Sequence, residues 1–151
     1  MDYSQLQLCT RPSQIDLLQL QVLFELAAFW ARERQLEELA IAIANSDPVV
    51  SAWDGEKMIG FARAISDDVY RATIWDVVIH PDYLGIGLGQ KLVETVLNHP
   101  RMNRVERIYL MTTDQQHVYK QVGFQRNPST TMVLSNRAFA NSSPSITADV
   151  S

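Results

Sequence analysis

Apolar residues follow helical spacing in the first third of this chain. Residues 15–30 form a helix-length run that is apolar on nearly every side. A helix of this kind is expected to be buried or to lie against a ligand or a partner. A second helix is predicted by the spacing i, i+3, i+4, i+7 at Leu36, Leu39, Ala40 and Ile43, and the sequence from Asn45 to Pro48 ends it.

Strands are predicted before and after these helices. Residues 3–9 alternate loosely, and three β-prone segments follow the second helix, at residues 49–53, 58–65 and 70–79. Asp54-Gly55 is a hairpin signal, and Ser66-Asp67-Asp68 is the turn before the third segment.

A glycine-rich loop at residues 81–89 begins the second half of the chain. The elements predicted beyond it are a helix to about Asn98, a strand at 105–111, a short helix at 114–122 that ends at Gly123, and a strand or hairpin at 124–134 that Pro128 interrupts. Together they predict one mixed α/β (α+β) domain over residues 1–140, in the order β-α-α-β-β-β-α-β-α-β(-β), and a flexible tail at residues 141–151.

Composition narrows the classes of function. Hydrophobic residues make up 46% of the chain and charged residues 20%, which is typical of a folded domain. The net charge of −4 disfavours a nucleic-acid partner. The one cysteine, Cys9, indicates a reducing compartment, and the longest apolar stretch, residues 22–31, is too short to span a bilayer. We therefore expect a cytoplasmic monomer or homodimer that binds neither nucleic acid nor membrane.

The most informative motif lies within residues 74–97. A strand runs into Gly85-x-Gly87-x-Gly89 and an amphipathic helix follows, so glycine backbone and a helix N-terminus could together cradle a phosphate. A Walker A loop would need a hydroxyl residue after Lys91, where Leu92 stands, and the glycine spacing differs from a dinucleotide fingerprint. Two interpretations of the motif remain: a loop that binds the pyrophosphate of coenzyme A, and a turn that only connects the strand to the helix.

Two motifs together resemble the GNAT superfamily of acyl-CoA-dependent N-acyltransferases. Residues 77–89 read VVIHPDYLGIGLG, similar to the acetyl-CoA motif of that family, and residues 118–124 read VYKQVGF, similar to its Y-x-x-x-G-F ending. Residues 51–64 and 74–77 are similar to the plastid and cyanobacterial branch described as serotonin N-acetyltransferases. Some members of that branch are described as protein lysine or N-terminal acetyltransferases.

The resemblance implies a central, mostly antiparallel sheet flanked by helices, with acetyl-CoA as cosubstrate. Leu84 stands where the family usually has Arg or Gln, so a side-chain contact is lost although the backbone N–H is kept. No metal is expected, because His80, His99 and His117 lack paired spacing. The residues implied in coenzyme binding are Val77, Val78 and Ile79 along the pantetheine, and Gly85, Ile86, Gly87, Leu88, Gly89 and Gln90 at the pyrophosphate.

The same resemblance suggests catalytic roles. Tyr119 matches the family's acid tyrosine, which protonates the departing thiolate. Asp76 is the acidic residue nearest to the expected thioester, so it is either the base that accepts the amine proton or a structural partner. Thr112 stands where related enzymes often have Asn or Asp; it can order a water, and a water chain is the other route for the proton.

Aromatic residues mark the candidate acceptor site. Phe29 and Trp30 lie near the junction of the first two helices, and Thr73 and Trp75 occupy alternate positions on the strand of Asp76. We expect them to bind an arylalkylamine such as serotonin or tryptamine, because aromatic surface favours an indole ring. The alternatives are a protein lysine or N-terminal amine and, outside catalysis, an acyl-CoA-binding module.

Overall fold

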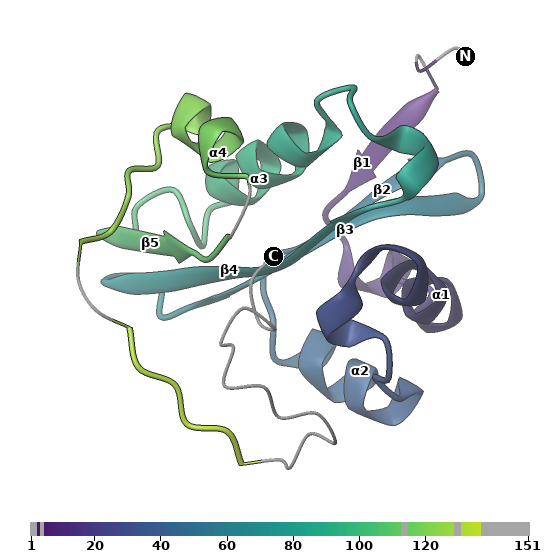
Figure 1. The fold of residues 1–151 in the computed structure, drawn as a ribbon, viewed down its shortest axis with the longest axis horizontal. Coiled ribbons are helices and arrows are strands. Elements are labelled where there is room, and N and C mark those ends of the chain that lie inside the picture. Colours follow the sequence, from purple (N-terminus) through teal and green to yellow (C-terminus); the bar gives the residue numbers. More distant parts are fainter. Residues whose placement is uncertain (1–2, 4, 113–114, 129–130, 137–151) are drawn as a thin grey trace.

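A five-stranded sheet lies at the centre of the structure, a computed structural model that describes residues 3, 5–112, 115–128 and 131–136. The strands follow one another across the sheet in chain order (Figure 1). The first four are antiparallel to their neighbours, and the fifth is parallel to the fourth. Their bounds are β1 Leu6–Cys9, β2 Val49–Asp54, β3 Lys57–Ser66, β4 Arg71–Ile79 and β5 Arg107–Leu110.

Helices cover both faces of this sheet (Figure 1). One face carries α1 (Leu17–Ala27) and α2 (Leu36–Ala44), and the other carries α3 (Leu88–Asn98) and α4 (Gln116–Val122). The Asp16 carboxylate starts α1 by accepting hydrogen bonds from the Leu18 and Gln19 N–H groups, at 3.0 and 3.2 Å. Short 3₁₀ turns occupy Pro12–Gln14, Phe29–Ala31 and Pro81–Tyr83.

Each face of the sheet buries its own apolar layer. Under α3, buried residues of β2, β3 and β4 pack against Leu88, Leu92, Val93 and Val96. Under α1 and α2, the rings of Phe24 and Phe61 meet edge to face with centroids 5.6 Å apart. Burial from both sides explains why β3 is almost continuously apolar in sequence.

Strand β4 is longer than its pairing with β5. The paired residues run from Arg71, opposite Arg107, to Ile74, opposite Leu110. Beyond Ile74, β4 continues to Ile79, and within the described part of the chain β5 does not accompany it. The two parallel strands therefore leave one edge of residues 75–79 open.

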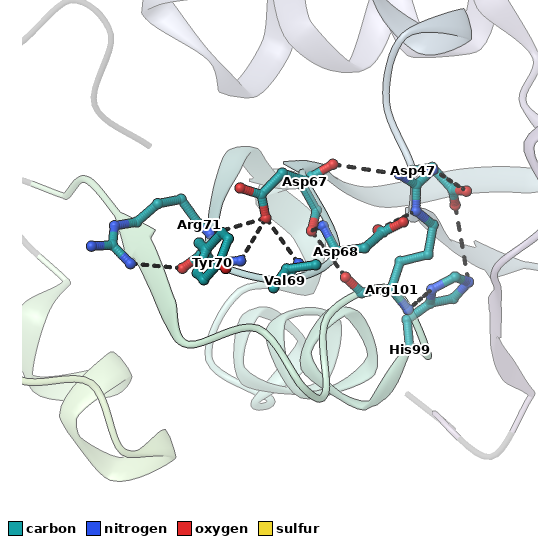
Figure 2. Close-up of polar contacts among 9 residues, drawn as sticks. Asp47, Asp67, Asp68, Val69, Tyr70, Arg71, His99 and Arg101 are labelled. Carbon is teal, nitrogen blue, oxygen red and sulfur yellow. Dashed lines mark hydrogen bonds and ion pairs between the residues drawn. The ribbon is translucent and has the colours of Figure 1, made fainter.

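The turn between β3 and β4 is held by charged groups, as Figure 2 shows. One oxygen of Asp67 accepts hydrogen bonds from the N–H groups of Val69, Tyr70 and Arg71, and these bonds lower the pKa of Asp67. Arg101, just after α3, donates to Asp68 at 2.6 Å and to Asp47 at 3.1 Å. The turn is thereby fixed to the ends of α2 and α3.

The predicted elements are confirmed from β1 to α4, with local differences. Helix α1 ends at Ala27, and residues 29–31 form a separate 3₁₀ turn. This helix buries Leu20, Leu23 and Phe24 but exposes Leu18, Val22 and Leu26, so it is less buried than its composition indicates. Among the described residues, no helix is long and apolar enough to cross a membrane.

The strand or hairpin expected at residues 124–134 is wrong for the described residues of that segment. Residues 124–128 and 131–134 belong to no helix or strand. Residues 125–127 are polar and exposed, and Pro128 has no N–H to donate to a ladder. Asp114, the expected start of the short helix, and the expected tail at residues 141–151 lie outside the described residues.

Candidate functional site

The glycine loop lies between the end of β4 and the start of α3. Gly85 and Gly87 have φ angles of 82° and 80°, in the left-handed region that favours glycine. A Cβ added to either residue would meet no heavy atom within 4 Å, so space lies open beside both. Gly87 also precedes the first turn of α3, whose N–H groups carry partial positive charge. Loop and helix together fit the phosphates of a ligand.

The start of this loop is anchored to the β2–β3 hairpin by Tyr83. Its ring is buried, and its hydroxyl donates to the Asp54 carboxylate at the end of β2. That hydrogen bond is the main reason that the pKa of Tyr83 rises to about 12. The Lys57 ammonium lies 5.7 Å from the ring centroid, and His80 meets the ring edge to face. The sequence marked Asp54 only as part of a hairpin turn, and Tyr83 carried no signal of its own.

The predicted coenzyme residues run along the chain from the end of β4 through the glycine loop into the first turn of α3. Ile79 ends the open edge of β4, and its side chain lies 4.0 Å from the Cβ position of Gly89 in α3. Val77 and Leu88 point into the core under α3, so they offer their backbone rather than their side chains. Leu84 is 64% exposed, consistent with a loop that binds through amides.

A bulge interrupts β4 at Asp76. Phe61 of β3 pairs with Val78 of β4, and Arg63 pairs with Trp75. The two pairs are two residues apart on β3 but three residues apart on β4. The extra residue falls at Asp76, whose φ of 56° is left-handed. A non-glycine residue in this conformation costs about 1–3 kcal/mol, so surrounding contacts must hold it.

Those contacts come from an indole and two guanidinium groups. Trp30 Nε1 donates to one oxygen of Asp76 at 3.0 Å, while Arg34 and Arg63 each donate to the other at 2.8 Å. Burial alone would raise the pKa of Asp76, which is 3% exposed, but the charges and hydrogen bonds of both arginines outweigh burial and lower it. Of the two roles that the sequence left open, these contacts favour the structural partner.

Tyr119 lies on α4, on the same side of the sheet as α3. It is buried in the core under that helix, with its ring edge to face against Phe124. Thr112 follows β5, and its hydroxyl accepts a hydrogen bond from the Gln115 N–H at 3.1 Å, close to the start of α4. His117, between them in sequence, is exposed.

The candidate acceptor residues lie mostly on the α1 side. Ala72 and Ile74 point into the core under α3, so Thr73 and Trp75 point to the opposite face. Trp30, partly buried, meets Phe29 edge to face, and Phe29 is 59% exposed. The structure thus brings Trp30 and Trp75 to the same side as Asp76 and leaves Phe29 largely exposed. No cluster of three metal-binding side chains occurs within the described ranges.

Comparison with known proteins decides the family. The model of the acetyltransferase (GNAT) family matches residues 15–124, which include every element from α1 to α4. This chain belongs to the GNAT acetyltransferase family. Enzymes of the GNAT fold use acetyl-CoA, which agrees with the shape of the glycine loop.

Solved structures share the GNAT fold. A protein described as a GNAT-family acetyltransferase from Xanthomonas campestris superposes with a TM-score of 0.75 at 25% identity, over 85% of this chain and 93% of that one. A similarly described acetyltransferase from Deinococcus radiodurans gives the same score at 23% identity, over 90% and 92%, and supports the fold alone.

Curated relatives of this GNAT chain carry several names. The N-acetyltransferase ycf52 of Pyropia yezoensis is 38% identical over 104 residues, 66% of this chain and 59% of its own length. Histone acetyltransferase TAP1 of Glycine max is 34% identical, over 76% of this chain and 54% of its own length. The chloroplastic serotonin N-acetyltransferase 2 of rice is 32% identical, over 63% of this chain and 50% of its own length. The chain thus spans little more than half the length of these relatives.

We expect Asp76→Asn to lower the free energy of unfolding of this GNAT domain at pH 7 by about 3 kcal/mol, because it leaves two guanidinium groups without their carboxylate. The folded-state pKa of Asp76 lies below the unfolded value of 3.8, so its stabilisation is full above that value and is lost as pH falls. Below about pH 4 the difference between wild type and variant should therefore shrink by about 1.4 kcal/mol per pH unit. Urea unfolding across pH measures this, and a constant difference would contradict it.

Proposed function

We propose that this protein is an acetyl-CoA-dependent N-acetyltransferase that transfers an acetyl group directly to a primary amine. The observation that carries the proposal is the continuity of three features: the open edge of β4, the left-handed glycines 85 and 87, and the N-terminus of α3. The first fits an extended pantetheine, and the other two fit a pyrophosphate.

Transfer requires a neutral amine. An alkylammonium has a pKa of about 10.4, so about one molecule in a thousand is neutral at pH 7. The Asp76 carboxylate is occupied by three donors, which supports a route through water rather than through that residue. In this proposal Thr112, at the end of β5, orders a water on the proton path.

The remaining steps use backbone and Tyr119. As the amine nitrogen bonds to the thioester carbon, N–H groups of residues 77–79 stabilise the negative charge on the carbonyl oxygen. The carbon–sulfur bond then breaks, and the Tyr119 hydroxyl gives its proton to the thiolate. A non-catalytic acyl-CoA-binding module would have no need of such an acid.

For the acceptor we propose an arylalkylamine such as tryptamine or serotonin. Trp30 and Trp75 offer indole surface on the side of β4 that faces α1, and rice serotonin N-acetyltransferase 2 is among the relatives. A lysine side chain of a protein is the second candidate. One ground for it is the exposed Phe29 side chain, which a peptide could contact. The other is the relative named as a histone acetyltransferase in soybean.

Gly87→Glu should abolish acetyl-CoA binding, because it places a carboxylate beside the phosphates at a left-handed position. Gly55→Glu is the matched control: Gly55 also has a positive φ, 61°, and open space around its Cβ position, but lies in the β2–β3 turn. Isothermal titration calorimetry should show no heat for the first variant and wild-type affinity for the second. Unchanged affinity of Gly87→Glu would place the coenzyme elsewhere.

Tyr119→Phe should lower kcat by about 10²–10⁴-fold and leave acetyl-CoA affinity unchanged, since the ring still packs but the proton donor is gone. Tyr70→Phe, at an exposed position of the β3–β4 turn, should have wild-type kcat. Single-turnover kinetics isolates the chemical step. A wild-type rate for Tyr119→Phe would assign this residue to the core only.

The acceptor is tested by comparing kcat/KM for tryptamine, spermidine and a lysine-containing peptide in one assay. We expect tryptamine to be preferred by about tenfold, the scale of an aromatic contact with an indole. A tenfold preference for the peptide would select the second candidate, and a preference for spermidine would contradict both. Acetylation of none of them, with intact coenzyme binding, would favour the binding module.

A further inference from the structure

One carboxylate joins two parts of the chain that lie on opposite sides of the proposed reaction. Trp30 and Arg34 belong to the connection between α1 and α2, and Asp76 belongs to the bulge in β4. Both oxygens of Asp76 are engaged by this connection, one by the Trp30 N–H and the other by Arg34. The connection is therefore held at a defined position relative to β4.

Each end of this link adjoins a different substrate. Trp30 and Phe29 are the candidate acceptor residues, whereas residues 77–79, directly after the bulge, are the proposed contacts of the thioester. We propose that Arg34 and Asp76 are positioning residues that set the acceptor side of the site against the β4 backbone. This inference rests on the proposed N-acetyltransferase function and adds a determinant of acceptor binding to it.

Arg34 and Arg63 differ in what they connect, although both donate to the same oxygen of Asp76 at 2.8 Å. Arg63 is on β3, directly opposite Trp75 of β4, so sheet hydrogen bonds already hold its strand beside Asp76. It also donates to the Ser46 hydroxyl. Arg34 instead ties the α1–α2 connection, which carries Trp30, to Asp76 of β4. Loss of Arg34 should therefore affect acceptor binding more than loss of Arg63 does.

The connection is also held by contacts other than the Arg34 guanidinium. The Arg34 carbonyl accepts a hydrogen bond from the Gln21 side chain of α1 at 3.1 Å, and the buried Ala31 packs in the core under α1 and α2. Neither contact needs the guanidinium. The guanidinium also lies 5.4 Å from the centroid of the buried Phe24 ring of α1, so the free energy of unfolding of each Arg34 variant is measured beside its kinetics.

The first experiment measures steady-state kinetics of Arg34→Gln, Arg63→Gln and Arg34→Lys. We expect Arg34→Gln to raise KM for the amine by about tenfold, the scale of a charged hydrogen bond, with KM for acetyl-CoA within about twofold of wild type. Arg63→Gln should raise the amine KM by less than about threefold. Arg34→Lys keeps the charge and should restore most of the affinity. Arg71→Gln, which removes the exposed β4 ion pair with Glu106, is the control and should match wild type.

The second experiment, hydrogen exchange, does not depend on turnover. Arg34→Gln should speed amide exchange in residues 28–35 and in residues 75–79 together, whereas Arg71→Gln should change neither segment. The inference would be overturned if exchange rose in only one of the two segments. It would also be overturned if the Arg34→Gln enzyme were active with an unchanged KM for the amine. A wild-type protein that acetylates no amine would overturn the proposed function instead, and exchange would still decide whether the link exists.

Discussion

A buried carboxylate in a left-handed conformation needs compensating charge, and Asp76 receives it from Arg34, Arg63 and the Trp30 indole. The bulge that this charge stabilises changes which residues of β4 face each layer. Before the bulge, Ala72 and Ile74 point into the core under α3. After the bulge, the next residue of β4 in that core is Val77, three positions after Ile74. Without the extra residue, Val77 would face α1 and Val78 would face α3. One charged cluster thus sets which residues at the end of β4 face each apolar layer.

The coenzyme side of the site depends on backbone geometry rather than on particular side chains. Open space beside Gly85 and Gly87, the first turn of α3 and the free edge of β4 are all main-chain features. Leu84, largely exposed in the middle of this segment, takes no part in the core. The side chains that matter here hold the backbone in place, as Tyr83 does through Asp54.

Local sequence patterns were sufficient for most of the fold. The segments at residues 49–53, 58–65 and 70–79 combine β-prone residues with clear turn signals, and the structure has β2, β3 and β4 there. The glycine loop and the helix after it were predicted equally well from the sequence. The expected strand after Gly123 failed because pairing depends on a partner edge as well as on local propensity, and Pro128 weakens it further.

Long-range contacts of the site were not readable from the sequence. Arg34, Arg63 and Asp76 are far apart in the chain, and neither arginine carried a motif. The isolated charge of Arg63 within the apolar run of β3 was the one available signal. The acidic character of Asp76 left a base and a structural partner both open, and the choice depends on neighbours that only the fold supplies.

The chain-order arrangement of the sheet also has a consequence for how the protein folds. Strands β2, β3 and β4 are joined by short turns, so their pairing closes small loops at low entropic cost. Strand β1 must instead pair with β2 across both N-terminal helices, and β5 must reach β4 across α3. We therefore expect the three-stranded meander to pair before β1 and β5 join it. Within those three strands Asp76 has Arg63 of β3 beside it, whereas its partners Trp30 and Arg34 arrive only when the α1–α2 connection docks, so we expect the charge of Asp76 to lose its water in two stages.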